Sequence, residues 1–209
     1  MEYAHYIWAG MTGLLTGMLY VRCTHAYLCH LNKPESTHWS FLKVFIIGAA
    51  LVWAVGTAHL YSVSPTWAGM LLIGGILIVA SAIDAAALVL PDMLTLPGFF
   101  IAMCVSIGIG MPFADVLLGS FIGAISLWSF QYAYWRRHGV VGVGTGDIKL
   151  MLMVGAISGL HGLPTLSLLT AGAGMVTLGW IRLVYQSPVH YIPLGPILAI
   201  GCMFHVLLD

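Results

Sequence analysis

Long apolar segments follow one another along this chain, separated by short clusters of proline, glycine and charged residues. A helix needs about 20 apolar residues to cross the hydrocarbon core of a bilayer. The pattern predicts eight membrane helices, two of them shorter than this length, at residues 4–22, 42–62, 67–89, 96–111, 115–135, 148–161, 164–184 and 191–208. The predicted fold is therefore all-α, a polytopic helical bundle within a membrane.

The composition also favours a bilayer as the surroundings of this chain. Hydrophobic residues make up 60% of the 209 positions and charged residues only 7%, and the mean hydropathy is +1.00. Ordinary soluble domains carry about 25% charged residues. The formal net charge is zero, which excludes the basic field that nucleic-acid binding requires. We expect the lipid bilayer, and no nucleic acid, among the partners.

The positive residues predict an orientation. If the chain crosses the membrane eight times, all seven fall on the same side, at Arg22, Lys33, Lys43, Arg136, Arg137, Lys149 and Arg182. Because positive residues gather in cytoplasmic loops, this side is predicted to be cytoplasmic and both termini non-cytoplasmic. We expect two regions, a two-helix region over residues 1–66 with a short cytoplasmic loop and a six-helix region over residues 67–209.

Two aspartates adjoin predicted helices at the cytoplasmic side. Asp84 lies in IDAAALVLPDMLTLP, residues 83–97, and Asp147 lies in GVGTGDIKLM, residues 142–151. A carboxylate near hydrocarbon is costly unless it is paired, hydrated or neutralised, so such a residue is a functional candidate. Two carboxylates that share a site of low dielectric constant hold one proton between them. Asp84 and Asp147 are therefore predicted to be the catalytic pair of an aspartic peptidase, although Asp147 alone could also be a helix cap.

The glycines before Asp147 suggest how a substrate could reach it. Gly142, Gly144 and Gly146 lack a Cβ atom, so we expect positive φ angles and close approach of a second chain. An extended substrate could then lie beside Asp147. We include Gly144 and Gly146 among the residues of the active-site loop.

Two further charged residues are candidates for the same region. Asp92 follows Pro91 at the start of a helical run and is predicted to be the helix N-cap, with a catalytic role as the alternative. Lys149 is expected to extend toward lipid head groups or to balance an aspartate. Both are assigned to the substrate-binding or active-site loop.

Three stretches of this sequence resemble the type IV prepilin peptidases, which are GxGD-type membrane aspartic proteases. They are DAAALVLPDMLTLP from Asp84, GTGDIKLM from Gly144 and IPLGPILAIG from Ile192. The resemblance implies that Asp84 and Asp147 match the family's catalytic aspartates. It also implies removal of the leader from type IV prepilins or pseudopilins at the cytoplasmic face of the bacterial inner membrane, without a cofactor.

The N-terminal third departs from the longer members of that family. Those members carry two Cys-x-x-Cys pairs in a large loop and also N-methylate the new N-terminus. The first loop here, residues 23–41, has no Cys-x-x-Cys, so the methyltransferase activity is not expected. A zinc site is the alternative for this loop, with irregularly spaced candidate ligands Cys23, His25, Cys29, His30 and His38. We predict an ordinary interfacial loop and no metal.

Two other classes of protein fit parts of the pattern. A proton-linked transporter would also place aspartates and broken helices within the membrane, but it predicts an internal repeat, and LPDMLTLP has no second copy. A non-catalytic subunit of a pilus or secretion machine would use the acids only as helix caps. The sequence does not distinguish oligomeric states.

Overall fold

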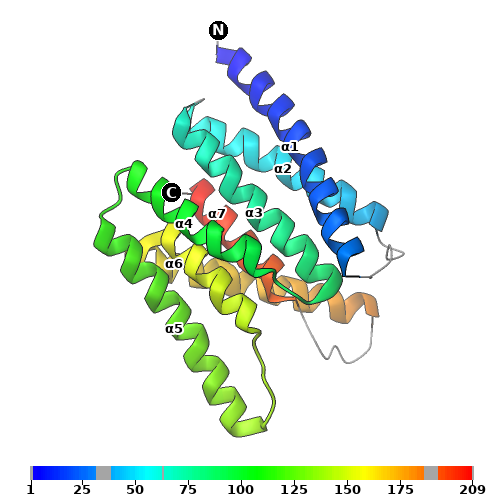
Figure 1. Ribbon diagram of the computed structural model, residues 1–209, viewed down its shortest axis with the longest axis vertical. Helices are drawn as coiled ribbons and strands as arrows, with labels where there is room; N and C mark the ends of the chain where they lie inside the picture. Colours follow the sequence, from blue (N-terminus) through cyan, green and yellow to red (C-terminus); the bar gives the residue numbers. More distant parts are fainter. Residues whose placement is uncertain (1, 32–38, 63, 186–192, 209) are drawn as a thin grey trace.

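All regular secondary structure in the part of the chain that can be described is helical. The computed structural model describes residues 2–31, 39–62, 64–185 and 193–208, and Figure 1 shows their arrangement. The helices within these residues are α1 (Glu2–His30), α2 (Trp39–Tyr61), α3 (Pro65–Ala87), α4 (Asp92–Gly108), α5 (Phe113–His138), α6 (Thr145–Tyr185) and α7 (Leu194–Leu208). The all-α prediction is confirmed.

Within the described residues, four helical segments are long and apolar enough to cross a membrane, judged by length and composition. They are α2, α3, α5 and residues 145–179 of α6. The helices α4 and α7 are also apolar but have only 17 and 15 residues. Membrane-spanning helices are thus supported, whereas the eight crossings and the side of the termini stay predictions.

Helix α6 is broken at Gly159 into two arms. Gly159 has φ 64° and ψ 179°, a backbone conformation that is essentially restricted to glycine. The chain changes direction at Gly159, where the first arm ends and the second begins. The two arms therefore run in different directions (Figure 1). The arms correspond to the predicted helices 148–161 and 164–184, but the break comes earlier than predicted and no separate loop joins them.

Small residues bring the first arm of α6 close to α5. A Cβ atom built on Gly119 of α5 would collide with backbone atoms of Gly155 and Gly159 in α6. A Cβ atom at Gly123, one turn further along α5, would lie 3.0 Å from the Met151 side chain of α6. In lipid, burial of apolar surface contributes little free energy to helix association. Van der Waals contact of this kind is therefore an important stabilising interaction.

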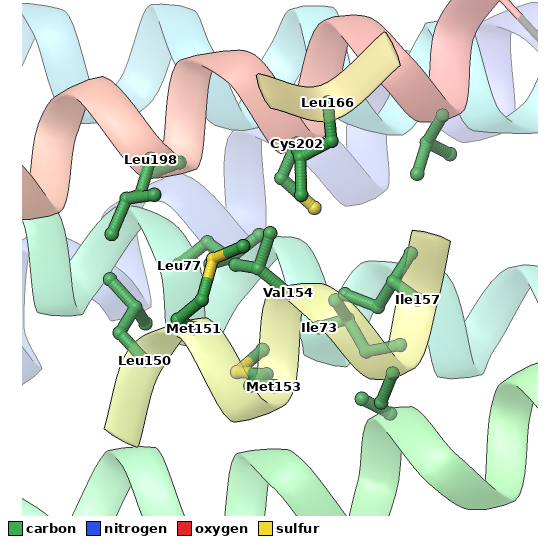
Figure 2. Close-up of a cluster of buried hydrophobic side chains, with 14 of the residues drawn as sticks. Ile73, Leu77, Leu150, Met151, Met153, Val154, Ile157, Leu166, Leu198 and Cys202 are labelled. Carbon is green, nitrogen blue, oxygen red and sulfur yellow. The ribbon is translucent and has the colours of Figure 1, made fainter. Parts of the chain in front are cut away.

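Helix α3 lies at the centre of the bundle. It is the most buried of the four segments, because 72% of the residues in its most apolar 18-residue stretch are buried. The largest core cluster joins α3 to α6 and α7, and Figure 2 shows its side chains pointing toward one another. Fully buried members include Ile73 and Leu77 of α3, Leu150 and Met153 of α6, and Cys202 of α7. This packing fixes the relative positions of the three helices that build the candidate site.

Helix α1 continues well past residue 22, where the sequence pattern predicted its end. Leu28, in the added part, is buried against Trp39 of α2 and Ala87 of α3. Tertiary contact therefore stabilises a helical continuation through a polar segment.

Candidate active site

Asp84 lies in the last turn of α3, where it is 6% exposed. The helix ends at Ala87, and Leu88 follows in the left-handed region with φ 55°. The Leu88 N–H closes this end by donating to the Asp84 carbonyl oxygen at 2.8 Å. The Asp84 side chain accepts a separate hydrogen bond at Oδ2 from the Gly195 N–H, also at 2.8 Å.

Gly195 joins the beginning of α7 to the end of α3. Its N–H donates to Asp84, and its carbonyl oxygen accepts from the Ser81 hydroxyl at 3.4 Å. A Cβ atom at Gly195 would lie 2.8 Å from Asp84 Oδ2 and 3.1 Å from Asp84 Cβ. Only glycine leaves room for this carboxyl group. Gly195 is in the third stretch that carries the family resemblance, but no feature of the sequence indicates its contact with Asp84.

Asp147 is the third residue of α6 and caps the start of that helix. Its Oδ2 accepts from the Gly144 N–H at 3.1 Å, while the Asp147 N–H donates to the Gly144 carbonyl oxygen at 3.2 Å. The acid at the third helical position thus supplies one half of a capping box, while Gly144 has no side chain to supply the other half. The capping role is confirmed. It uses only Oδ2, because the buried Oδ1 has no hydrogen-bond partner among the described residues.

One cavity of about 220 Å³ has both carboxyl groups in its wall. Its lining is Asp84, Leu88, Val89, Leu90, Gly144, Thr145, Gly146 and Asp147. The two aspartates are 6% and 8% exposed and close enough for their charges to interact. The prediction that these two acids lie in one site is confirmed, since both line the same cavity. The segment 88–90 was not predicted as part of the site.

The glycine-rich segment has a different backbone from the predicted one. Among the described glycines, positive φ occurs at residues 110, 139 and 159, and not at Gly142, Gly144 or Gly146. The prediction of positive φ was therefore wrong. Close approach does occur, but by the chain's own residues, since a Cβ at Gly146 would lie 2.7 Å from the Cβ of Leu90. The absence of a side chain lets the start of α6 pack against the segment before α4.

Asp92 and Lys149 do not line the cavity. They pair with each other, with Lys149 Nζ 2.6 Å from Oδ1 and 2.7 Å from Oδ2 of Asp92. The N-cap prediction for Asp92 was wrong, because Pro91 occupies the N-cap position and Asp92, the first helical residue, directs its carboxylate to Lys149. The expectation that Lys149 balances an aspartate is confirmed.

The first loop shows no metal centre in the part that the structure describes. Across residues 2–31, 39–62, 64–185 and 193–208, no three His, Cys, Asp or Glu side chains are placed to hold an ion. The four cysteines are free thiols, and Cys29 Sγ lies 3.7 Å from His25 Nε2. His38 lies outside the described residues.

The sequence comparison agrees with the location of this site. The model of the type IV leader peptidase family matches residues 71–179, which is more than half of the chain and includes both buried aspartates. The chain belongs to the type IV leader peptidase family. The resemblance inferred from the three motif stretches is therefore confirmed.

Several curated relatives bear the name prepilin leader peptidase/N-methyltransferase. The protein from Pectobacterium carotovorum subsp. carotovorum is 32% identical over 187 residues, covering 87% of this chain and 63% of the relative. That from Xanthomonas campestris pv. campestris is 32% identical and covers 81% of this chain and 58% of the relative. That from Dickeya chrysanthemi is 34% identical and covers 73% and 52%. The chain thus spans less than two thirds of these relatives. No solved structure matches it significantly.

Proposed function

We propose that this chain is a prepilin leader peptidase of the aspartic type. It cleaves the N-terminal leader of a type IV prepilin or pseudopilin at the cytoplasmic face of the bacterial inner membrane. The family match and the names of the relatives support this substrate class. The observation that carries the proposal is the presence of two buried carboxyl groups, from α3 and α6, in the wall of one small cavity.

The dyad performs the hydrolysis without a covalent intermediate. The ionised carboxylate takes a proton from water as the water oxygen attacks the peptide carbonyl carbon. The protonated carboxyl group donates a hydrogen bond to the carbonyl oxygen, which gains negative charge. The C–N bond of the tetrahedral intermediate then breaks, and the leaving amine receives a proton from the pair. These roles belong to Asp84 and Asp147 jointly.

The hydrogen bonds around the dyad support this use of the two side chains. Gly195 and Gly144 each donate a backbone N–H to one carboxyl oxygen and so fix the orientation of Asp84 and Asp147. Asp147 Oδ1 has no partner among the described residues, so its lone pairs are not used by a protein donor there. A preorganised acceptor of this kind is what proton abstraction requires.

The substrate is proposed to lie in extended form along the segment 88–90. Leu88 and Val89 line the cavity and are 54% and 45% exposed, so their apolar side chains are accessible beside the dyad. Gly144 and Gly146 also belong to the lining. The Asp92–Lys149 pair joins α4 to α6 next to this segment and is assigned a positioning role.

We also propose that the two arms of α6 cross the membrane separately, which gives eight crossings with both termini outside. The first two helices, within residues 1–66, then form one region and residues 67–209 the peptidase region. Cys29 tests the orientation, since it is exposed and would face the cytoplasm. In a variant that keeps only Cys29, an impermeant maleimide should react after cell lysis and not in intact spheroplasts. Reaction in intact spheroplasts would contradict the orientation.

The decisive test of the function is the mass of a co-expressed prepilin's N-terminus. The wild-type chain should remove the leader, whereas Asp84→Asn and Asp147→Asn should each leave it attached in a folded protein. Asp92→Asn alters an exposed carboxylate outside the cavity, so it should still remove the leader, at a rate lowered by no more than about threefold. No processing by the wild-type chain would contradict the function, and processing by folded Asp147→Asn would contradict the mechanism. The same spectrum reports any added methyl group.

A further inference from the structure

A pocket near the ends of α1 and α2 lies apart from the candidate active site. Its volume is about 380 Å³, and its lining consists of Val21, Arg22 and His25 from α1 with Trp39 and Lys43 from α2. Residues four apart on a helix share a face, so each helix turns one face toward this pocket. The two helices run side by side (Figure 1).

The Trp39 ring lies close to two other polar side chains of the pocket, those of His25 and Lys43. Its ring centroid is 5.4 Å from that of His25 and 5.3 Å from the Lys43 Nζ. The side chain is buried, and its Nε1–H has no acceptor among the residues that the structure describes. Buried N–H groups of this kind nearly always have a hydrogen-bond partner. Besides the cations, the pocket wall thus contains a residue whose buried N–H lacks an acceptor in the described part of the chain.

The positive charge of the pocket is not balanced by a described carboxylate. The ion pairs within the described ranges are Lys149–Asp92 and His161–Asp115, so neither Arg22 nor Lys43 takes part in one. Among the residues that the structure describes, none that lines the pocket is acidic. In addition, α2 begins at Trp39, and the N-terminus of a helix carries partial positive charge. An anion with several acceptor oxygens would satisfy all of these groups.

We propose that this pocket binds a phosphate group, either in the head group of an anionic phospholipid or as free phosphate. The planar Arg22 guanidinium matches two phosphate oxygens, while Lys43 supplies a point charge and Trp39 a single donor. Arg22 lies about two turns before the end of α1, and Lys43 about one turn after the start of α2. Both positions are near helix ends, where head groups meet membrane helices.

Native mass spectrometry tests this proposal with the full chain in neutral detergent, titrated with phosphatidylglycerol. The double variant Arg22→Gln, Lys43→Gln should weaken binding of the first lipid roughly thirtyfold, and each single variant about fivefold. The matched control is Arg136→Gln, Arg137→Gln, which removes two exposed cations from the last turn of α5. Its affinity should stay within about twofold, because distant exposed charges are screened.

Competition with inorganic phosphate distinguishes the two sources of the group. Displacement of the lipid by phosphate identifies a site that also accepts free phosphate, and failure to displace it identifies a head-group site. Both results support the proposal if they depend on Arg22 and Lys43. The proposal would be overturned if the two double variants lost phosphatidylglycerol affinity equally. It would also be overturned if oleate, which has no phosphate, bound as tightly as phosphatidylglycerol. Since Arg22 is exposed, its single variant keeps the test valid if the double variant does not fold.

Discussion

The dyad of Asp84 and Asp147 and the nearby pair of Asp92 and Lys149 show how differently carboxylates are used within one region. The dyad is buried, and its members accept backbone N–H groups without any cation among the described residues. Asp92 and Lys149 form an ion pair whose side chains are 57% and 35% exposed. The two sites are only two residues apart in α6 but have opposite electrostatic surroundings.

This difference indicates which acids can carry chemistry. An exposed ion pair costs little and contributes little, because water and salt screen it. A buried carboxylate without a cation is costly, so the fold must hold it in place by packing and by backbone hydrogen bonds. A buried group that lowers the stability of the fold is typical of a functional site. Four predictions test the contrast.

The largest effect is expected at the dyad. Asp84→Asn or Asp147→Asn removes a group that exchanges a proton in the proposed mechanism, so kcat for leader cleavage should fall roughly 10³-fold or more. The thermal unfolding temperature of these variants in detergent should not be lower than that of the wild type, because the variants no longer bury a potential charge. A steady-state cleavage assay with a purified prepilin checks the rate. A residual rate above one tenth of wild type would contradict the assignment.

The next largest effect is expected at Gly195. A methyl group there would displace the Asp84 carboxyl group, so Gly195→Ala should lower kcat by about 10- to 100-fold through misplacement of the dyad. Gly172→Ala is the control, since a Cβ at Gly172 meets nothing within 4 Å. Cleavage kinetics of the two variants should differ clearly. Equal activities would show that the Gly195 contact does not position Asp84.

Gly119 should affect stability more than chemistry. Its substitution by alanine forces α5 away from the backbone of α6 at Gly155 and Gly159, which we expect to cost about 1–3 kcal/mol of unfolding free energy. The control Gly48→Ala has open space around the added atom and should be neutral or slightly stabilising. Denaturant unfolding in detergent measures both. An unchanged stability in Gly119→Ala would contradict the close packing.

The smallest effect is expected at the exposed pair. Asp92→Asn should change stability by no more than about 1 kcal/mol and cleavage by no more than about threefold, because the pair is exposed. The double charge reversal Asp92→Lys, Lys149→Asp should behave like the single variant or better. A loss comparable to that of the dyad would place Asp92 in the catalytic machinery. The comparison drawn above would then fail.

Helix positions followed from the sequence where apolar length alone decides them. The helices α2, α3 and α5 begin and end within a few residues of the predicted ranges. The break in α6 was misplaced because Gly159, Gly162 and Pro164 are all plausible breaking points. Which of them takes the positive φ depends on how closely α5 approaches, and that contact lies about 40 residues away in sequence.

The chemical part of the site was more predictable than its support. Asp84 and Asp147 could be selected because a charged residue beside an apolar segment is conspicuous in this composition. Gly195, Leu88 and Leu90 carry no such signal, and their part in the site arises only when α3, α6 and α7 pack together. Asp92 was misassigned because a proline followed by an aspartate favours two neighbouring cap positions almost equally.

The different hydrogen bonding of the two carboxyl oxygens of Asp147 has a practical consequence. One oxygen holds the first turn of α6 through Gly144, and the other is left without a protein partner. Asparagine keeps a carbonyl oxygen for Gly144 while it cannot take up the proton. A protein carrying Asp147→Asn should therefore retain an uncut prepilin and serve as a trap for isolating the enzyme–substrate complex.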